Sequence, residues 1–316
     1  MKLVFSNPII ALVTVTIAMG LMPLNDAAIK LMNNDVSLSQ VIIIRAGLIL
    51  SFLIFLRSTW RSLAGHSLST WCLMLLRGCM IALAMVCFFS GLAFLGLWEA
   101  TAIFFTAPLM ISLLSVFFLG ERLGLWRISA QFLGLGGILL IALPESKTSF
   151  NPVFVLPLVG ALFYALYNVF TRLMSNRVST LAMTNVQHLS YILVGIVISV
   201  IVFFVPFEQF SEEVLGPEMS FIVRDWRMPS LMHWAWLAGA ALLFGFLSFA
   251  LTNAYANVEA SLVAPFEYVY IPVSIIWSIL IWNDWPSLLG WIGCGCIAGA
   301  GLLTIVRENL KSDELG

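Results

Sequence analysis

Charged side chains are scarce in this chain: 10% of its 316 residues are Asp, Glu, Lys or Arg, and the formal net charge is −1. A chain with this net charge has no basic surface that could bind the phosphates of nucleic acid. We therefore expect no nucleic-acid partner. The sequence also lacks a P-loop, an H-E-x-x-H motif, a G-x-S-x-G motif and any C-x-x-C pair. We therefore expect no catalytic residues, no metal site and no cofactor.

Apolar residues dominate instead, at 61% of the chain, with a mean hydropathy of +1.03. A water-soluble fold of this length could not bury so much apolar surface, so the lipid bilayer must cover the remainder. Continuous apolar runs indicate helices and not barrel strands, and each helix needs about 20 residues to cross the bilayer. Breaks in hydropathy predict an all-α membrane protein with ten spans, near residues 8–30, 38–57, 71–95, 99–119, 125–143, 152–173, 181–206, 233–256, 259–282 and 286–306.

The distribution of Lys and Arg predicts the orientation, because positively charged loops stay in the cytoplasm. With the N-terminus inside, nine basic residues are cytoplasmic, namely Lys2, Arg57, Arg61, Arg122, Arg127, Arg172, Arg177, Arg307 and Lys311. Four face outward, namely Lys30, Lys147, Arg224 and Arg227. This asymmetry favours a multi-pass inner-membrane protein with both termini cytoplasmic and a periplasmic, partly helical loop at 207–232.

An internal repeat organises the chain. Residues 29–37 (IKLMNNDVS) match 171–179 (TRLMSNRVS) at five of nine positions, and 98–102 (WEATA) corresponds to 258–262 (VEASL). The matches predict five helices in each of two repeats, at 1–144 and 152–306, followed by a cytoplasmic tail at 307–316. An odd number of helices inverts the second repeat in the membrane, and such a plan is typical of secondary transporters.

Two stretches carry a resemblance to a known family, GLAFLGLWEATAIFFTAPLMISLLSVFFLGERLGLWRISAQFLGLGGILLIALP at 91–144 and ANVEASLVAPFEYVYIPVSIIWSILIWNDWPS at 256–287. They resemble the drug/metabolite transporter superfamily in its double EamA-domain form, and the resemblance covers essentially the whole chain. The second repeat departs from the pattern, with Asn283-Asp284 where Gly-Glu is common and a longer spacing after Ala264-Pro265. LNDAAIK (24–30), LRGCM (76–80) and APFEYVY (264–270) are most similar to a branch with S-adenosylmethionine uptake carriers. The resemblance implies ten helices, cytoplasmic termini and a central cavity lined by both repeats.

Glu267 is the outstanding candidate site residue. It lies about eight residues into the ninth predicted span, near the middle of the bilayer, with no basic residue within one helical turn. Tyr268 and Tyr270 follow it closely and offer hydroxyl groups and ring faces to a substrate. Two interpretations are open: Glu267 binds a cationic group or a coupling proton, or it is a protonated structural carboxyl.

Asp26 and Arg45 lie at similar predicted depths on the first two spans. They either form a structural ion pair, the cheapest way to hold two charges in lipid, or Arg45 binds a substrate carboxylate while Asp26 is a gate or proton site. The second repeat has Asn168 and Gln187 at the equivalent positions.

Other polar residues are weaker candidates. Glu99 and Glu259 each begin a span, where the helix dipole favours a carboxylate, and are interpreted as architectural. His188 is either a proton carrier or a buried, hydrogen-bonded imidazole. A further set either lines the cavity or packs helices together, namely Tyr164, Tyr167, Asn168, Asn253 and Tyr255.

These observations favour a secondary transporter that moves a small cationic or zwitterionic metabolite by alternating access, driven by a gradient or by exchange. An intramembrane enzyme, a structural membrane subunit, and an exporter of drugs or vitamins are the alternatives. A homodimer is compatible with each of these functions.

Overall fold

The computed structural model describes residues 8–55, 57–121, 125–142, 152–205 and 219–313, and every regular element in these ranges is a helix. The all-α prediction is therefore confirmed for the described part of the chain. The first half contains α1 (Pro8–Leu31), α2 (Leu38–Ile54), α3 (Arg57–Leu63), α4 (Leu68–Phe94), α5 (Leu97–Phe104), α6 (Ala107–Leu119) and α7 (Leu125–Ala142). The second half contains η1 (Pro152–Phe154), α8 (Val155–Met174), α9 (Thr180–Phe204), α11 (Leu231–Asn257), α12 (Ala260–Val263), η3 (Ala264–Val269), α13 (Tyr270–Trp282) and α14 (Leu288–Asp313).

Serine begins four of the long helices. Ser37, Ser67, Ser179 and Ser230 precede α2, α4, α9 and α11 with extended backbone, and each side chain accepts a hydrogen bond from the backbone N–H three residues on. Such N-caps satisfy one of the free N–H groups in the first helical turn. Polar serines between apolar runs therefore fix where these helices start.

Six helical segments are long and apolar enough to cross a bilayer, or seven if the bent pair α2 and α3 counts as one span. The six are Ile10–Leu31, Leu68–Phe94, Leu97–Leu119, Pro152–Met174, Thr180–Phe204 and Leu231–Asn257. Phe266–Trp282 and Leu288–Ala300 are shorter apolar helices. Each of these segments coincides with a predicted span, so the chain is a multi-span membrane protein.

Two predicted spans are interrupted. The span near 99–119 divides into α5 and α6, and the span near 259–282 divides into α12, the 3₁₀ helix η3 and α13. Pro108 and Pro265 lie at the start of α6 and η3. Proline has no N–H to donate and crowds the carbonyl four residues earlier, so it interrupts the hydrogen-bond ladder. Such breaks in membrane helices are typical of transporter binding sites.

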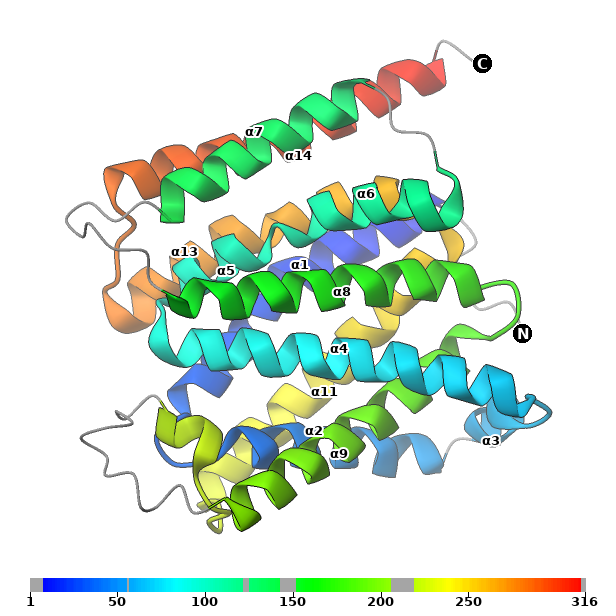
Figure 1. The fold of residues 1–316 in the computed structure, drawn as a ribbon, viewed down its shortest axis with the longest axis vertical. Coiled ribbons are helices and arrows are strands. Elements are labelled where there is room, and N and C mark those ends of the chain that lie inside the picture. The colour runs from blue at the N-terminus through cyan, green and yellow to red at the C-terminus, as the bar shows by residue number, and fades with distance from the viewer. Residues whose placement is uncertain (1–7, 56, 122–124, 143–151, 206–218, 314–316) are drawn as a thin grey trace.

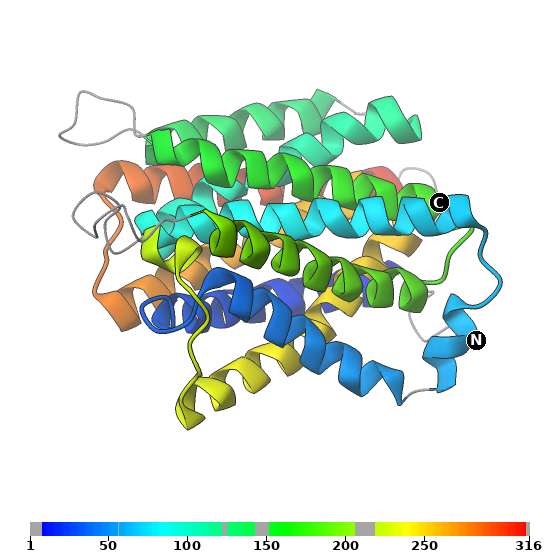
Figure 2. The ribbon, with the colours of Figure 1, turned by 60° about the horizontal axis from the view of Figure 1, so that its bottom comes forward.

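The helices lie side by side with their axes roughly parallel (Figure 1). The most extensive packing joins α7 to α14, α4 to α8, α1 to α11, and α9 to both α2 and α4. In Figure 1 the pair α7 and α14 forms one edge of the molecule, and the pair α2 and α9 lies towards the opposite edge; Figure 2 shows the same helices after a 60° turn. Each of these close pairs joins one helix of the first half to one of the second, so the two halves interlock.

The chain ends differ slightly from expectation. Helix α14 continues to Asp313, so most of the predicted tail at 307–316 is helical. Residues 206–218 of the predicted 207–232 loop lie outside the described residues. The later part of that loop packs against the molecule: Arg224 donates to the carbonyl of Asn33 at 3.2 Å, and Gln40 donates to the carbonyl of Arg227 at 2.7 Å.

Candidate functional site

Glu267 lies inside η3, the 3₁₀ segment that interrupts the ninth predicted span, and only 2% of its surface is exposed. Two tyrosines on other helices donate to the same carboxyl oxygen. Tyr255 of α11 donates to Oε1 at 2.5 Å, and Tyr164 of α8 donates to Oε1 at 3.1 Å. Glu267 therefore connects the interrupted helix to α8 and α11 in the interior of the protein.

The second oxygen of Glu267, Oε2, makes no hydrogen bond within the described residues, and no Lys, Arg or His of that part forms an ion pair with this carboxyl. A buried carboxylate without a cation is costly, because burial removes the water that would stabilise its charge. Oε2 is therefore a position where a proton or a cationic group of a ligand can bind.

A second buried carboxyl, Asp26 of α1, has a similar environment and is 5% exposed. Tyr270, at the start of α13, donates a hydrogen bond to Oδ2, and Asn25 donates to Oδ1 at 2.8 Å. The contact with Tyr270 brings together two predicted site residues that are 244 positions apart.

The predicted ion pair between Asp26 and Arg45 does not form in this structure. Asp26 uses both oxygens for Tyr270 and Asn25, whereas Arg45 of α2 makes no ion pair or hydrogen bond within the described residues. The guanidinium of Arg45 instead lies over the ring of Phe244, with its carbon 4.0 Å from the ring centroid. The sequence predicted that Asp26 and Arg45 lie at similar depths in the membrane, but it could not determine where either side chain points.

Three of the remaining predicted residues cluster on α8. The rings of Tyr164 and Tyr167 stack with centroids 6.2 Å apart, and Asn168 donates to the carbonyl of Tyr164 at 3.0 Å. Asn168 is fully buried and its Oδ1 has no hydrogen-bond partner within the described residues. Glu267, Tyr164, Tyr167 and Asn168 thus form one connected group.

Tyr268 and Asn253, two further predicted site residues, make no contact of this kind with the Glu267 group. Tyr268 packs against Phe105, with ring centroids 6.1 Å apart, and makes no hydrogen bond to Glu267. Asn253 accepts a hydrogen bond from Asn257 on its own helix at 3.2 Å. The partner that completes the Glu267 site is Tyr255, which the sequence indicated only as a cavity-lining candidate.

Arg77 of α4 is a buried residue whose environment the sequence did not predict. Its guanidinium donates to Thr171 at 2.7 Å, to the carbonyl of Met183 at 3.1 Å and to Thr252 at 3.2 Å. It also lies 4.2 Å from the centroid of the Tyr167 ring. The sequence did place Arg77 inside an apolar span, and a charge at that depth in the membrane requires hydrogen-bonding partners. Arg77 is held by neutral acceptors next to the Glu267 group.

Basic residues also lie at the two opposite ends of the helix stack. At the end of α1, Lys30 donates to the carbonyl of Leu95 at 2.5 Å, just after α4. At the end of α8, Arg172 donates to the carbonyl of Ala256 at 3.0 Å, in the last turn of α11. Figure 1 shows that these helix ends lie at opposite sides of the molecule. A cation near the C-terminal carbonyls of a helix is favourable.

Glutamates occupy the expected positions at two helix starts. Glu99 accepts a hydrogen bond from the backbone N–H of Gly96 at 3.0 Å and so caps α5. Glu259 is the residue before α12, and its side chain makes no capping hydrogen bond. Glu121, from the end of α6, instead accepts from the N–H of Ala260 at 3.3 Å. Their placement at helix termini agrees with the architectural interpretation.

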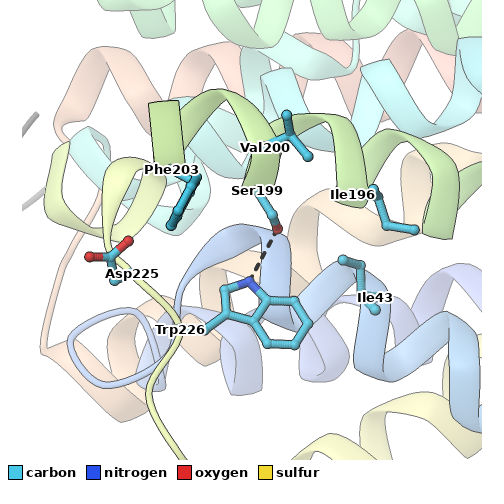
Figure 3. Close-up of a pocket in the computed structure, with 7 residues that line it drawn as sticks. All are labelled: Ile43, Ile196, Ser199, Val200, Phe203, Asp225 and Trp226. Atoms are coloured by element: carbon cyan, nitrogen blue, oxygen red, sulfur yellow. Dashed lines mark hydrogen bonds between the residues drawn. The ribbon is translucent and has the colours of Figure 1, made fainter. Parts of the chain in front are cut away.

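A surface hollow of about 400 Å³ lies between α2 and α9, away from Glu267. Trp226 forms one wall and donates to Ser199 at 3.1 Å, and Asp225 lies at its edge (Figure 3). The other lining residues are the apolar Ile43, Ile196, Val200 and Phe203. Ile196 and Phe203 are 47% and 77% exposed, so this hollow lies on the apolar outer surface and not at the buried Glu267 site.

Comparison with solved structures supports the fold. A crystal structure superimposes on 95% of this chain and 97% of its own chain, with a TM-score of 0.63 at 18% sequence identity. At that identity the similarity shows a shared fold.

Curated relatives are transporters. The riboflavin transporter of Vibrio cholerae is 25% identical over 68% of this chain and 65% of its own length. The pseudopaline exporter of Pseudomonas aeruginosa is 27% identical over 77% of this chain and 76% of its own length. The S-adenosylmethionine uptake transporter of Rickettsia prowazekii is 25% identical over 74% of this chain and 71% of its own length. The match to the Vibrio protein thus spans slightly less than two thirds of that relative.

A family model covers the first half of the chain. Residues 7–143 match the EamA-like transporter family, which coincides closely with the first predicted repeat. This match and the relatives agree with the resemblance seen in the sequence. Residues 7–143 are therefore similar to the EamA-like transporter family, and the chain as a whole is similar to curated transporters.

Proposed function

We propose that the chain is a secondary carrier of a small cationic or zwitterionic metabolite, with Glu267 as the central binding group. Amino acids, amines and nucleoside-containing compounds such as S-adenosylmethionine are the candidate substrates. The observation that carries the proposal is the buried carboxyl of Glu267, which lies in an interrupted membrane helix and has one oxygen free of hydrogen bonds within the described residues. Interrupted helices that bind ligands near the middle of the bilayer are characteristic of secondary transporters.

The proposed architecture has ten spans in two inverted five-helix repeats, at 1–144 and 152–306. The first repeat consists of α1, α2, α4, α5 with α6, and α7. The second consists of α8, α9, α11, α12 with η3 and α13, and α14. Helix packing supports this division, because the first helix of each repeat packs against the third of the other, the second against the second, and the fifth against the fifth.

Equivalent capping contacts support the same division. The basic residue at the end of each repeat's first helix, Lys30 or Arg172, binds a carbonyl at the end of that repeat's third helix. Each fourth helix ends with left-handed backbone, at Gly120 with φ 68° and at Asn283 with φ 52°. After Gly, Asn is among the residues that adopt this conformation most readily, which fits the departure from Gly-Glu at Asn283-Asp284.

Transport would follow from rocking of the two repeats around the buried carboxyl. In the present conformation Lys30 and Arg172 bind helix-end carbonyls at the two ends, and Glu267 is buried. Release of one set of contacts would open the site to one side at a time. The beginning of α1 and the end of α14 lie at the same side of the helix stack, as cytoplasmic termini in the inner membrane require (Figure 1).

Exchange assays with purified protein in liposomes test the proposed function. Liposomes are loaded in turn with unlabelled amino acids, amines, riboflavin or S-adenosylmethionine, and entry of the labelled compound is followed. We expect saturable exchange of at least one compound, absent from liposomes without protein. No exchange above that control for any compound would contradict the proposal and favour an intramembrane enzyme or a structural subunit. Exchange restricted to riboflavin would contradict the cationic or zwitterionic substrate class.

A further inference from the structure

Three polar side chains meet around Phe244 of α11, apart from the contacts of Glu267. Arg45 comes from α2, and His188 and Tyr191 come from α9, with exposed fractions of 2%, 0% and 1%. The guanidinium carbon of Arg45 lies 4.0 Å from the centroid of the Phe244 ring. The rings of His188 and Tyr191 lie 6.0 Å and 5.7 Å from that of Phe244. The ring of Phe244 therefore has a cation, an imidazole and a phenol close around it.

Each of these side chains has a buried polar atom without a hydrogen bond within the described residues: Nη1 of Arg45, the hydroxyl of Tyr191 and Nδ1 of His188. The amide oxygen of Gln187, a neighbour of Tyr191, accepts from the Tyr167 hydroxyl at 2.7 Å and makes no hydrogen bond of good geometry with Tyr191. Asp26 accepts from Tyr270 and Asn25 and makes no ion pair with Arg45. Most buried polar groups in proteins have partners, so three unpartnered atoms around one ring indicate a ligand.

The chemistry of the three atoms restricts that ligand. Arg45 and Tyr191 offer N–H and O–H donors, which suit a carboxylate. Ser248 donates to the carbonyl of Gly245 at 3.1 Å, and its oxygen lies 3.4 Å from Nε2 of His188. Nε2 then carries the imidazole proton and donates to Ser248, which leaves a lone pair on Nδ1 that needs a donor. A carboxylate alone would satisfy two of the three atoms, whereas a carboxylate beside an ammonium would satisfy all three.

We propose that Arg45, Tyr191 and His188 form a subsite for the head group of an α-amino acid, with the carboxylate on Arg45 and Tyr191 and the ammonium on Nδ1 of His188. The subsite rests on the proposed transport function and narrows its substrate to compounds with a free amino acid group. Phe244 holds the guanidinium in place by its cation–π contact. Glu267 remains available for a second cationic group of the same substrate.

Ligand-induced thermal stabilisation of the purified protein tests the subsite. The probes are a mixture of the protein amino acids with S-adenosylmethionine, and the carboxamides of the same compounds at equal ionic strength. Wild type should show a saturable rise in melting temperature with the free acids and none with the amides. Tyr191→Phe should weaken the apparent affinity by about tenfold, since it removes one hydrogen bond to a charged group. Equal stabilisation by acids and amides, no saturable stabilisation, or wild-type affinity in Tyr191→Phe would overturn the proposal.

Arginine substitutions distinguish a binding group from a structural one. Arg45→Gln should abolish the response to the free acids, yet leave the unliganded protein at least as stable as wild type, because it removes an unpaired buried cation. Arg77→Gln is the matched control, since Arg77 is equally buried but makes three hydrogen bonds, and its loss should lower the melting temperature. Arg61→Gln, at an exposed position, should change neither property. Destabilisation of Arg45→Gln to the level of Arg77→Gln would make Arg45 structural and overturn the subsite.

The transport assay separates this inference from the proposed function. If only the free acids stabilise the protein and no compound is exchanged, the amino acid subsite is retained and the proposed carrier function is contradicted. Exchange of an amine without a carboxylate, unchanged in Arg45→Gln, would preserve the carrier and eliminate the subsite.

Discussion

At the scale of single residues, the protein holds its buried carboxyl groups with phenols instead of cations. Glu267 accepts from Tyr255 and Tyr164, and Asp26 accepts from Tyr270. Phenol hydroxyls satisfy a carboxyl oxygen in either protonation state, whereas a lysine or arginine would fix the negative charge in place. Under the proposed function, the charge of Glu267 is then balanced by a proton or a substrate.

The first prediction concerns Tyr255. Tyr255→Phe removes the shorter of the two hydrogen bonds to Glu267, and we expect it to lower the free energy of unfolding by about 1–3 kcal/mol, the range for hydrogen bonds to charged or buried groups. Thermal unfolding monitored by size-exclusion chromatography in detergent measures the effect. Tyr268→Phe is the control, because the Tyr268 hydroxyl makes no hydrogen bond within the described residues. A loss no greater than that of Tyr268→Phe would show that the Tyr255 contact does not stabilise the fold.

The sequence predicted the candidate carboxyls well and their partners poorly. A carboxylate inside an apolar span stands out at once, so Glu267 and Asp26 were identifiable from their positions. Their partners lie on other helices, and Tyr270 is 244 residues from Asp26. Only the packing of the helices determines that Tyr270 points to Asp26 and not to Glu267, and that Arg45 turns towards Phe244.

At the scale of secondary-structure elements, the helix ends carry equivalent capping contacts on both sides of the molecule. Lys30 also lies 5.5 Å from the centroid of the Trp282 ring, and Asp284 lies close enough to α5 that a Cβ on Gly96 would come within 2.6 Å of its Oδ2. At the opposite end, Glu121, Arg172 and Glu259 line a polar hollow. These contacts join the end of one helix to the beginning or end of another at both ends of the molecule.

The second prediction concerns those two ends. Lys30→Met and Arg172→Met each remove a cation that binds helix-end carbonyls, and each should cost about 1–2 kcal/mol of stability. Because the residues lie at opposite ends, the double variant should lose the sum of the two within about 0.5 kcal/mol. Thermal unfolding of the two single variants and the double variant measures this. Strong non-additivity would show that the two ends are coupled in the closed conformation.

Helix positions were largely predictable, since hydropathy breaks and serine N-caps mark them in the sequence. The interruptions in the fourth and ninth predicted spans were not, because their apolar runs continue through the breaks. Pro108 and Pro265 were visible but not decisive, because membrane helices tolerate proline. Pro23 within the continuous helix α1 shows this directly.

At the scale of the whole molecule, the two halves form one interlocked helix stack and not two separate domains. The close pairs α1 with α11 and α4 with α8 each join helices from different halves. The buried carboxyl of Glu267 is held from α8 and α11, so movement of either half would change its environment. Under the proposed function, opening of one end would therefore change the surroundings of Glu267.

The third prediction concerns orientation. Reporter fusions after Gly316 and within the 207–232 loop near Gly216 should lie on opposite sides of the membrane. A fluorescent protein should be active at the first position, and alkaline phosphatase at the second, because the excess of Lys and Arg favours cytoplasmic termini. Both reporters on one side would contradict the ten-span arrangement.

Gradient-driven accumulation by Glu267→Gln tests the central claim most directly. Gln can accept the hydrogen bonds of Tyr255 and Tyr164 but cannot ionise, so the variant should fold and insert normally and lose accumulation by at least about tenfold. Glu259→Gln, at an exposed carboxyl on the same predicted span, should accumulate substrate as wild type does. Wild-type accumulation by Glu267→Gln would show that Glu267 supports the helix only, and would contradict its role in transport.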